Sequence, residues 1–118
     1  MTKKVLIVED EAIHAMALAD VIPLQGIGVA GVVDNGEEAV RAAERLGPDV
    51  VLMDVRIRGS IDGLGAAREI AGRLKIPVIF MTGLEDPETL AKAREVHPLA
   101  ILAKPLDVDL LVELLHRV

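Results

Sequence analysis

Side chains that can take part in metal or phosphoryl chemistry stand directly after four short apolar runs of this sequence. They are Glu9 and Asp10 after the first run, Asp54 after the second, Thr82 and Gly83 after the third, and Lys104 after the fourth. If the runs are parallel strands of one sheet, these residues meet at its carboxyl edge, where ligands bind in such folds. The site would then hold three carboxylates, one hydroxyl and one ammonium group.

Three carboxylates at one edge repel one another. Two of them at a separation of about 4 Å do so by roughly 4 kcal/mol at an effective dielectric of about 20, and the single charge of Lys104 does not offset all three. Such a cluster calls for raised carboxyl pKa values or for a bound divalent cation. Ligands that are all oxygen favour Mg²⁺.

A carboxylate beside Mg²⁺ is a candidate phosphoryl acceptor, and Asp54 is the carboxylate directly after the run 50–53, whose consecutive apolar residues suit a central strand. Lys104 and the Thr82 hydroxyl would neutralise the phosphoryl oxygens. Gly83 would let the backbone N–H approach the phosphoryl group closely. The residue types therefore predict phosphoryl transfer to Asp54.

The elements that position these residues alternate along the chain. Short β-branched runs at 5–8, 29–33, 50–53, 77–81 and 100–103 predict strands. Amphipathic stretches predict helices over 12–23 and 37–46, and behind the capping residues Asp62, Asp86 and Asp107. The apolar residues of the first helix, which we expect on one side of it, are Ile13, Met16, Ala17 and Val21; those of the second are Ala39, Val40, Ala43 and Leu46.

Strict alternation of strands and helices with short connections predicts a doubly wound α/β fold, in which helices cover both faces of one parallel sheet. We expect a single domain over residues 1–118, since 52% of the 118 residues are hydrophobic and no linker or repeat is visible. The absence of cysteine excludes disulfides and is compatible with a cytoplasmic protein.

The composition also argues against some classes of binding partner. A net charge of −6 and the lack of Tyr and Trp argue against direct binding of nucleic acid. No apolar stretch has the roughly 18 residues of a membrane span. The three histidines, His14, His97 and His116, are not at metal-ligand spacing and are expected on the surface.

The segments VLIVEDE (5–11), VLMD (51–54), IFMTG (79–83) and AKP (103–105) resemble the receiver domain of two-component response regulators. This resemblance covers nearly the whole chain. It implies a flavodoxin-like sheet of order 2-1-3-4-5 and transfer of a phosphoryl group onto Asp54 from a histidine kinase or histidine phosphotransfer protein. It also implies that the Lys104–Pro105 bond is cis.

The resemblance further assigns roles at the site. Asp10, Asp54 and the backbone carbonyl of Arg56 would bind Mg²⁺, while Glu9 would act through a metal-bound water. Lys104 and Thr82 would contact the phosphoryl group. Phosphorylation would shift a surface formed by the helix after Asp86, strand 100–103 and the last helix, which a downstream protein, an output domain or a second copy in a homodimer would bind.

Three features depart from the family pattern. Ile101 stands where the family commonly has a Tyr or Phe that rotates with the threonine, so an aromatic switch is absent. The loop after Asp54 carries an extra residue. Arg56 and Leu84, each two positions after a site residue, are expected to obstruct the water that would hydrolyse the phosphate.

Other functions fit less well. An aspartate-nucleophile phosphatase of the haloacid dehalogenase-like kind needs Asp-x-Asp, and the second position here is Arg56. A flavin carrier lacks the aromatic rings for stacking and a phosphate loop rich in Ser and Thr. A binding module that is never phosphorylated would not need all the site residues. We therefore expect a phosphoacceptor that is not an enzyme beyond its own phosphorylation from small donors and its own dephosphorylation.

Overall fold

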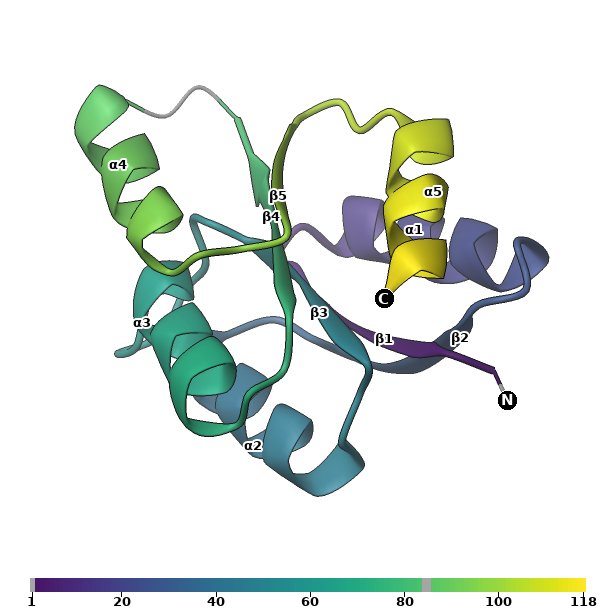
Figure 1. Cartoon of the computed structure of the whole chain (residues 1–118), viewed down its shortest axis with the longest axis horizontal. Helices are drawn as coiled ribbons and strands as arrows, with labels where there is room; N and C mark the ends of the chain where they lie inside the picture. Colours follow the sequence, from purple (N-terminus) through teal and green to yellow (C-terminus); the bar gives the residue numbers. More distant parts are fainter. Residues whose placement is uncertain (1, 84–85) are drawn as a thin grey trace.

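A computed structural model of the chain describes residues 2–83 and 86–118 (Figure 1). Five strands alternate with helices along the chain. They are β1 (Lys4–Val8), α1 (Ala12–Leu24), β2 (Gly28–Val33), α2 (Gly36–Leu46), β3 (Val50–Asp54), α3 (Gly63–Arg68), β4 (Val78–Thr82), α4 (Pro87–Glu95), β5 (Ala100–Ala103) and α5 (Val108–Arg117). A π-helical turn, η1 (Glu69–Arg73), continues α3.

The strands form one parallel sheet of order β2-β1-β3-β4-β5. Helices α1 and α5 cover one face, and α2, α3 and α4 cover the other (Figure 1). The doubly wound, flavodoxin-like fold predicted from the sequence is confirmed, including its strand order.

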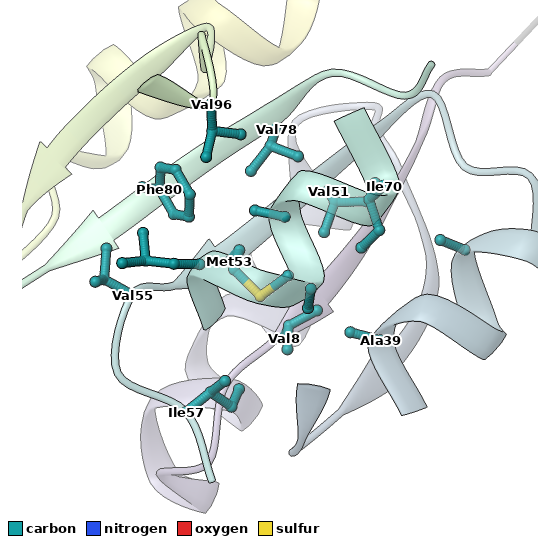
Figure 2. Packing of buried hydrophobic residues seen from close by; sticks show 14 of the residues in the cluster. Val8, Ala39, Val51, Met53, Val55, Ile57, Ile70, Val78, Phe80 and Val96 are labelled. Atoms are coloured by element: carbon teal, nitrogen blue, oxygen red, sulfur yellow. The ribbon is translucent and has the colours of Figure 1, made fainter. Parts of the chain in front are cut away.

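The three central strands carry the core. Their apolar side chains are at most 1% exposed because helices cover both faces of the sheet. On the face under α2, α3 and α4, Phe80, Met53 and Val51 belong to one buried cluster with Ile70 (Figure 2). A core packed on both sides holds the strands rigidly, and it therefore fixes the positions of the residues at their carboxyl ends.

The helices start where the sequence predicts capping residues. Asp62, Asp86 and Asp107 each accept a hydrogen bond from the backbone N–H three residues on. Helix α2 is capped in the same way by Asn35, and Asp34 lies in the turn before it. Each cap satisfies one of the N–H groups that a helix start leaves without an intrahelical partner.

Helix α1 does not turn the side that carries Ile13 and Met16 to the sheet. Ile13 and Met16 are 86% and 65% exposed, and the buried residues are Ala15, Leu18 and Ile22. The reason is that α1 is apolar on both sides, so the spacing of its apolar residues does not select one face. On α2, Ala39 and Ala43 are buried as predicted, but Leu46 at the end of the helix is 41% exposed.

Glycine at position 63 is required by close packing. A Cβ atom there would lie 2.5 Å from each of the carbonyl oxygens of Asp54 and Val55. The start of α3 therefore lies against the end of β3, directly beside the predicted acceptor. Within the described residues, no helix is both long enough and apolar enough to span a membrane.

Candidate functional site

The register of the sheet brings the ends of four strands side by side. Val8 pairs with Met53, Asp54 with Met81, and Thr82 with Ala103. The backbone N–H of Lys104 donates to the carbonyl of Thr82 at 2.8 Å, which continues the ladder one residue beyond β5. The residues that follow these strands therefore share one edge, as the sequence predicts.

Lys104 connects three carboxylates at this edge. Its Nζ lies 2.5 Å from Oδ2 of Asp54, 3.0 Å from Oε2 of Glu9 and 3.5 Å from Oε1 of Glu11. The side chains of Glu9 and Asp54 are buried, and that of Lys104 is 21% exposed. Because one ammonium serves two buried carboxylates, the charge of the inner site is negative. The peptide bond between Lys104 and Pro105 is cis, as expected.

The carboxylate of Glu9 has donors on both oxygens. Its Oε1 accepts the backbone N–H of Glu11 at 3.0 Å, and its Oε2 lies 2.7 Å from Nδ1 of His14 and 3.0 Å from Nζ of Lys104. The expectation that His14 is a surface residue is wrong: it is half-buried and belongs to the site, whereas His97 and His116 are exposed. The position of His14 in the sequence did not indicate this role, because its contact with Glu9 depends on how the start of α1 lies beside the end of β1.

Asp10 completes the acidic pocket. Carboxylate oxygens of Glu9, Asp10 and Asp54 lie within 4.8 Å of one another. Nε of Arg58 lies 3.8 Å from Oδ2 of Asp10, in a contact whose side chains are 68% and 25% exposed. A set of three carboxylates with one exposed side fits a hard divalent cation such as Mg²⁺, which takes oxygen ligands and keeps several waters.

Burial and partners shift the pKa values of Glu9 and Asp54 in opposite directions. Burial raises the pKa of Asp54, the charge of Glu9 adds to this, and hydrogen bonds from Lys104 and the Arg56 N–H only partly oppose it. Burial also acts on Glu9, but donors from Glu11, His14 and Lys104 outweigh it and lower the pKa of that carboxyl group. The two carboxylates raise the pKa of Lys104 against its own burial, so it is an ammonium group.

The remaining predicted residues lie around this cluster. Thr82 is 6% exposed at the end of β4, and its hydroxyl donates to the carbonyl of the exposed Gly83 at 3.5 Å. The Arg56 N–H donates to Oδ1 of Asp54 at 2.9 Å. Ile101 is half-buried against the core that contains Phe80. Leu84 lies outside the described residues.

The structure thus brings Glu9, Asp10, Asp54 and Lys104 together and places Thr82 on the adjoining strand end. Sequence reasoning missed His14 and Glu37, whose carboxylate holds the loop after Asp54. Neither role has a local sequence signal, because each contact joins the start of a helix to a segment that the fold brings beside it.

Comparison with known proteins gives a consistent result. Residues 5–116 match the family model described as response regulator receiver domain. The chain is 36% identical over 110 residues to the transcriptional regulatory protein PdtaR of Mycobacterium tuberculosis, a match that covers 93% of this chain and 53% of PdtaR. The chain therefore spans about half the length of that relative.

Solved structures resemble it over almost its full length. The signal receiver domain of a modulated diguanylate cyclase from Desulfovibrio desulfuricans G20 is 40% identical, with a TM-score of 0.94 and coverage of 99% of this chain and 93% of that one. The receiver domain of the sensor histidine kinase PA1611 from Pseudomonas aeruginosa PAO1 is 29% identical, with a TM-score of 0.85 and coverage of 99% and 97%. That second structure has a magnesium ion coordinated in its active site cleft. This chain belongs to the family of response regulator receiver domains.

Proposed function

We propose that this receiver domain accepts a phosphoryl group on Asp54 in a reaction that requires Mg²⁺. The observation that carries the proposal is the environment of this one carboxylate: it is buried, its pKa is raised, and its Oδ2 contacts the ammonium of Lys104. A carboxylate that is poorly compensated as an anion is stabilised when a cation binds beside it, and such a cation also reduces the negative charge that an incoming phosphoryl group would meet.

In the proposed step, a carboxylate oxygen of Asp54 forms a bond to phosphorus while the P–N bond of a donor phosphohistidine breaks and the imidazole nitrogen leaves. Lys104 exchanges its contact with Asp54 for one with a phosphoryl oxygen, and the Thr82 hydroxyl donates to another. Gly83 lets the backbone approach the phosphoryl group. The protein's contribution is positioning and charge neutralisation rather than covalent catalysis.

The acidic pocket would hold the metal. We assign Asp10, Asp54 and the backbone carbonyl of Arg56 as direct ligands, with Glu9 acting through a metal-bound water. The close approach of the three carboxylates supports this set, as does the magnesium ion in the cleft of the PA1611 receiver domain. When bound, Mg²⁺ neutralises negative charge on the attacking carboxylate and on the phosphoryl group.

The phosphoryl donor in this proposal is a histidine kinase or histidine phosphotransfer protein. A groove beside Lys104, lined by Ile13, Ala17, Leu106 and Val108, supports a protein donor because it places apolar side chains next to the lysine that contacts Asp54. The response would pass through the surface of α4, β5 and α5 to a downstream protein, an output domain or a second copy. Since Ile101 replaces an aromatic side chain, that surface would shift by packing changes rather than by ring rotation.

Arg56 is proposed to prolong the phosphorylated state. Its side chain is exposed at the mouth of the pocket, two residues after the acceptor, where it would obstruct the attacking water. We expect Arg56→Ala to shorten the half-life of the phosphorylated protein. An unchanged half-life in this variant would contradict the role.

The main test is incubation with acetyl phosphate and Mg²⁺, followed by intact-mass measurement. We expect the mass of one phosphoryl group to be gained by the wild type and lost with Asp54→Asn or with a chelator. Asp49→Asn is the matched control, since Asp49 precedes the opposite end of β3 and its carboxylate accepts the N–H of Lys4 at 2.7 Å. A full mass gain in Asp54→Asn would refute the proposal, and no gain in the wild type would favour the binding module that is never phosphorylated.

A further inference from the structure

The loop between β3 and α3, residues 56–62, is attached to the start of α2. Both the Ser60 hydroxyl and the Ile61 N–H donate to Oε1 of Glu37, at 2.7 Å and 2.6 Å. The N–H of Gly36 donates to the carbonyl of Arg58 at 3.2 Å. One carboxylate and one backbone group of α2 thus hold the middle of a loop that otherwise crosses the surface.

Close packing supports the same attachment. A Cβ atom on Gly36 would lie 1.9 Å from the carbonyl oxygen of Ile61, and one on Gly59 would lie 2.6 Å from Oε2 of Glu37. Gly59 also has a φ of +118°, in the region that favours glycine. The loop and the helix start therefore approach too closely for a side chain at position 36, and the backbone conformation of Gly59 disfavours one at position 59.

The attached loop forms one wall of the acidic pocket. At its beginning the Arg56 N–H donates to Oδ1 of Asp54 at 2.9 Å, and Nε of Arg58 lies 3.8 Å from Oδ2 of Asp10. At its end Asp62 caps α3. The loop is therefore held at its beginning by the site and at its end by α3. The attachment of its middle to α2 fixes the conformation of the residues between these two ends.

We propose that Glu37 is a positioning residue for the phosphoacceptor site: by holding Ser60 and Ile61 it fixes the loop that carries Arg56 and Arg58 beside Asp54 and Asp10. This inference rests on the proposed function of Asp54 and Mg²⁺, and it adds a residue outside the pocket that sets the affinity for the metal. Glu37 touches neither metal nor phosphoryl group and acts only through the loop.

The ionisation of Glu37 agrees with this role. Hydrogen bonds from the Ser60 hydroxyl and the Ile61 N–H lower the pKa of its carboxyl group, so it is an anion at neutral pH. Charged acceptors make stronger hydrogen bonds than neutral ones. Replacing the carboxylate by an amide would therefore weaken the attachment, and replacing it by a methyl group would remove it.

The test compares Glu37→Ala and Glu37→Gln with Glu38→Ala. Glu38 is the next residue of α2 and carries the same charge in the same helical turn, but its carboxylate contacts Arg41 and not the loop. Hydrogen exchange of the 58–61 amides and the Mg²⁺ dissociation constant from calorimetry are measured for each variant. Thermal unfolding followed by circular dichroism shows whether each variant is folded.

We expect Glu37→Ala to speed exchange in residues 58–61 and to raise the Mg²⁺ dissociation constant about tenfold, the lower end of what residues that orient metal ligands contribute. Glu37→Gln, which keeps an acceptor oxygen, should lie between the wild type and Glu37→Ala. Glu38→Ala should match the wild type in both measurements.

Two results would overturn the inference: loop amides in Glu37→Ala that exchange as slowly as in Glu38→Ala, or Mg²⁺ dissociation constants for these two variants within twofold of each other. Failure of the proposed function looks different. In that case the wild type binds Mg²⁺ with an ordered loop but gains no mass from acetyl phosphate. A wild type that binds no Mg²⁺ would remove both the proposed metal site and the role of Glu37 toward it.

Discussion

The ends of β1 and β3 each place a buried carboxyl group in the same pocket, yet the two groups behave differently. Glu9 and Asp54 are 2% and 6% exposed, and both contact Lys104. The pKa of Glu9 is lowered and that of Asp54 is raised. The difference comes from the other donors, because Glu9 also has the Glu11 N–H and His14, whereas Asp54 has the Arg56 N–H and faces the charge of Glu9.

This contrast shows that burial alone does not decide which acid is reactive. Glu9 is stabilised as an anion by the folded chain, and it therefore serves as a fixed charge. Asp54 is left with too little compensation, so a proton or a cation at this position stabilises the fold. Substitutions in and around the pocket should therefore affect the two carboxyl groups differently.

Lys104→Met should destabilise the protein most, by about 3 kcal/mol, because it leaves two buried carboxylates facing one another without their shared cation. Urea unfolding at pH 8 measures this loss. At pH 5 the loss should be smaller, since removal of the ammonium makes both carboxyl groups easier to protonate. Lys92→Met removes an exposed charge that pairs with Glu88 at 3.5 Å and should change stability by less than about 0.5 kcal/mol.

Glu9→Gln should destabilise the protein by about 1.5 kcal/mol at pH 7, since hydrogen bonds to a charged group are lost. The pKa of Glu9 is lower in the folded state than its ordinary 4.5, so the ionised group contributes stability above pH 4.5 that is lost as pH falls through the folded value. Unfolding free energies of the two proteins should therefore converge in acid. If the free energies of unfolding of the wild type and Glu9→Gln differ by the same amount at pH 3 and pH 7, the lowered pKa of Glu9 is contradicted.

Asp54→Asn should act in the opposite direction and stabilise the metal-free protein by about 1 kcal/mol, as expected when a functional site is relieved of an unfavourable charge. The folded pKa of Asp54 lies above its ordinary 3.8, so ionisation opposes folding at neutral pH and the gain should fade as pH falls through the folded value. Denaturant unfolding at pH 7 and pH 4 checks both statements.

Addition of Mg²⁺ should reduce the stability difference between Asp54→Asn and the wild type. At ten times its dissociation constant the metal stabilises the wild type by about 1.4 kcal/mol, and Asp54→Asn should gain less because a ligand is lost. Equal stabilisation of both proteins would place the metal elsewhere.

Glu11→Gln should have the smallest effect, less than about 0.5 kcal/mol. Glu11 also contacts Lys104, at 3.5 Å, but its side chain is 71% exposed. Its backbone N–H, which holds Glu9, is untouched by the substitution. If Glu11→Gln loses as much stability as Glu9→Gln, contact with Lys104 is what stabilises a carboxylate at this site. Burial and the number of donors would then not explain why Glu9 and Asp54 differ.

The sheet and the strand-end residues were predictable from the sequence for a physical reason. Consecutive apolar residues in β3 and β4 can only be buried on both faces, which requires a central parallel strand with helices on either side. In such a sheet the residue after each strand must lie at the carboxyl edge. Asp54 and Lys104 therefore meet although 50 residues separate them.

Other features depend on contacts that no local pattern encodes. The face that α1 turns to the sheet could not be predicted, because Ile13 and Met16 are as apolar as the buried Leu18 and Ile22. Helix packing against β2 and α5, not periodicity, selects the face. His14 and Glu37 were missed because the roles of both arise from where a helix start meets a neighbouring segment.

Gly63 limits which substitutions this domain can tolerate. It bears no chemistry, but the space where its side chain would be is occupied by the carbonyl oxygens of Asp54 and Val55. Even an alanine would have to push the end of β3 away from α3. Random mutagenesis selected only for signalling should therefore reject substitutions at this glycine almost as strictly as those at the aspartate beside it.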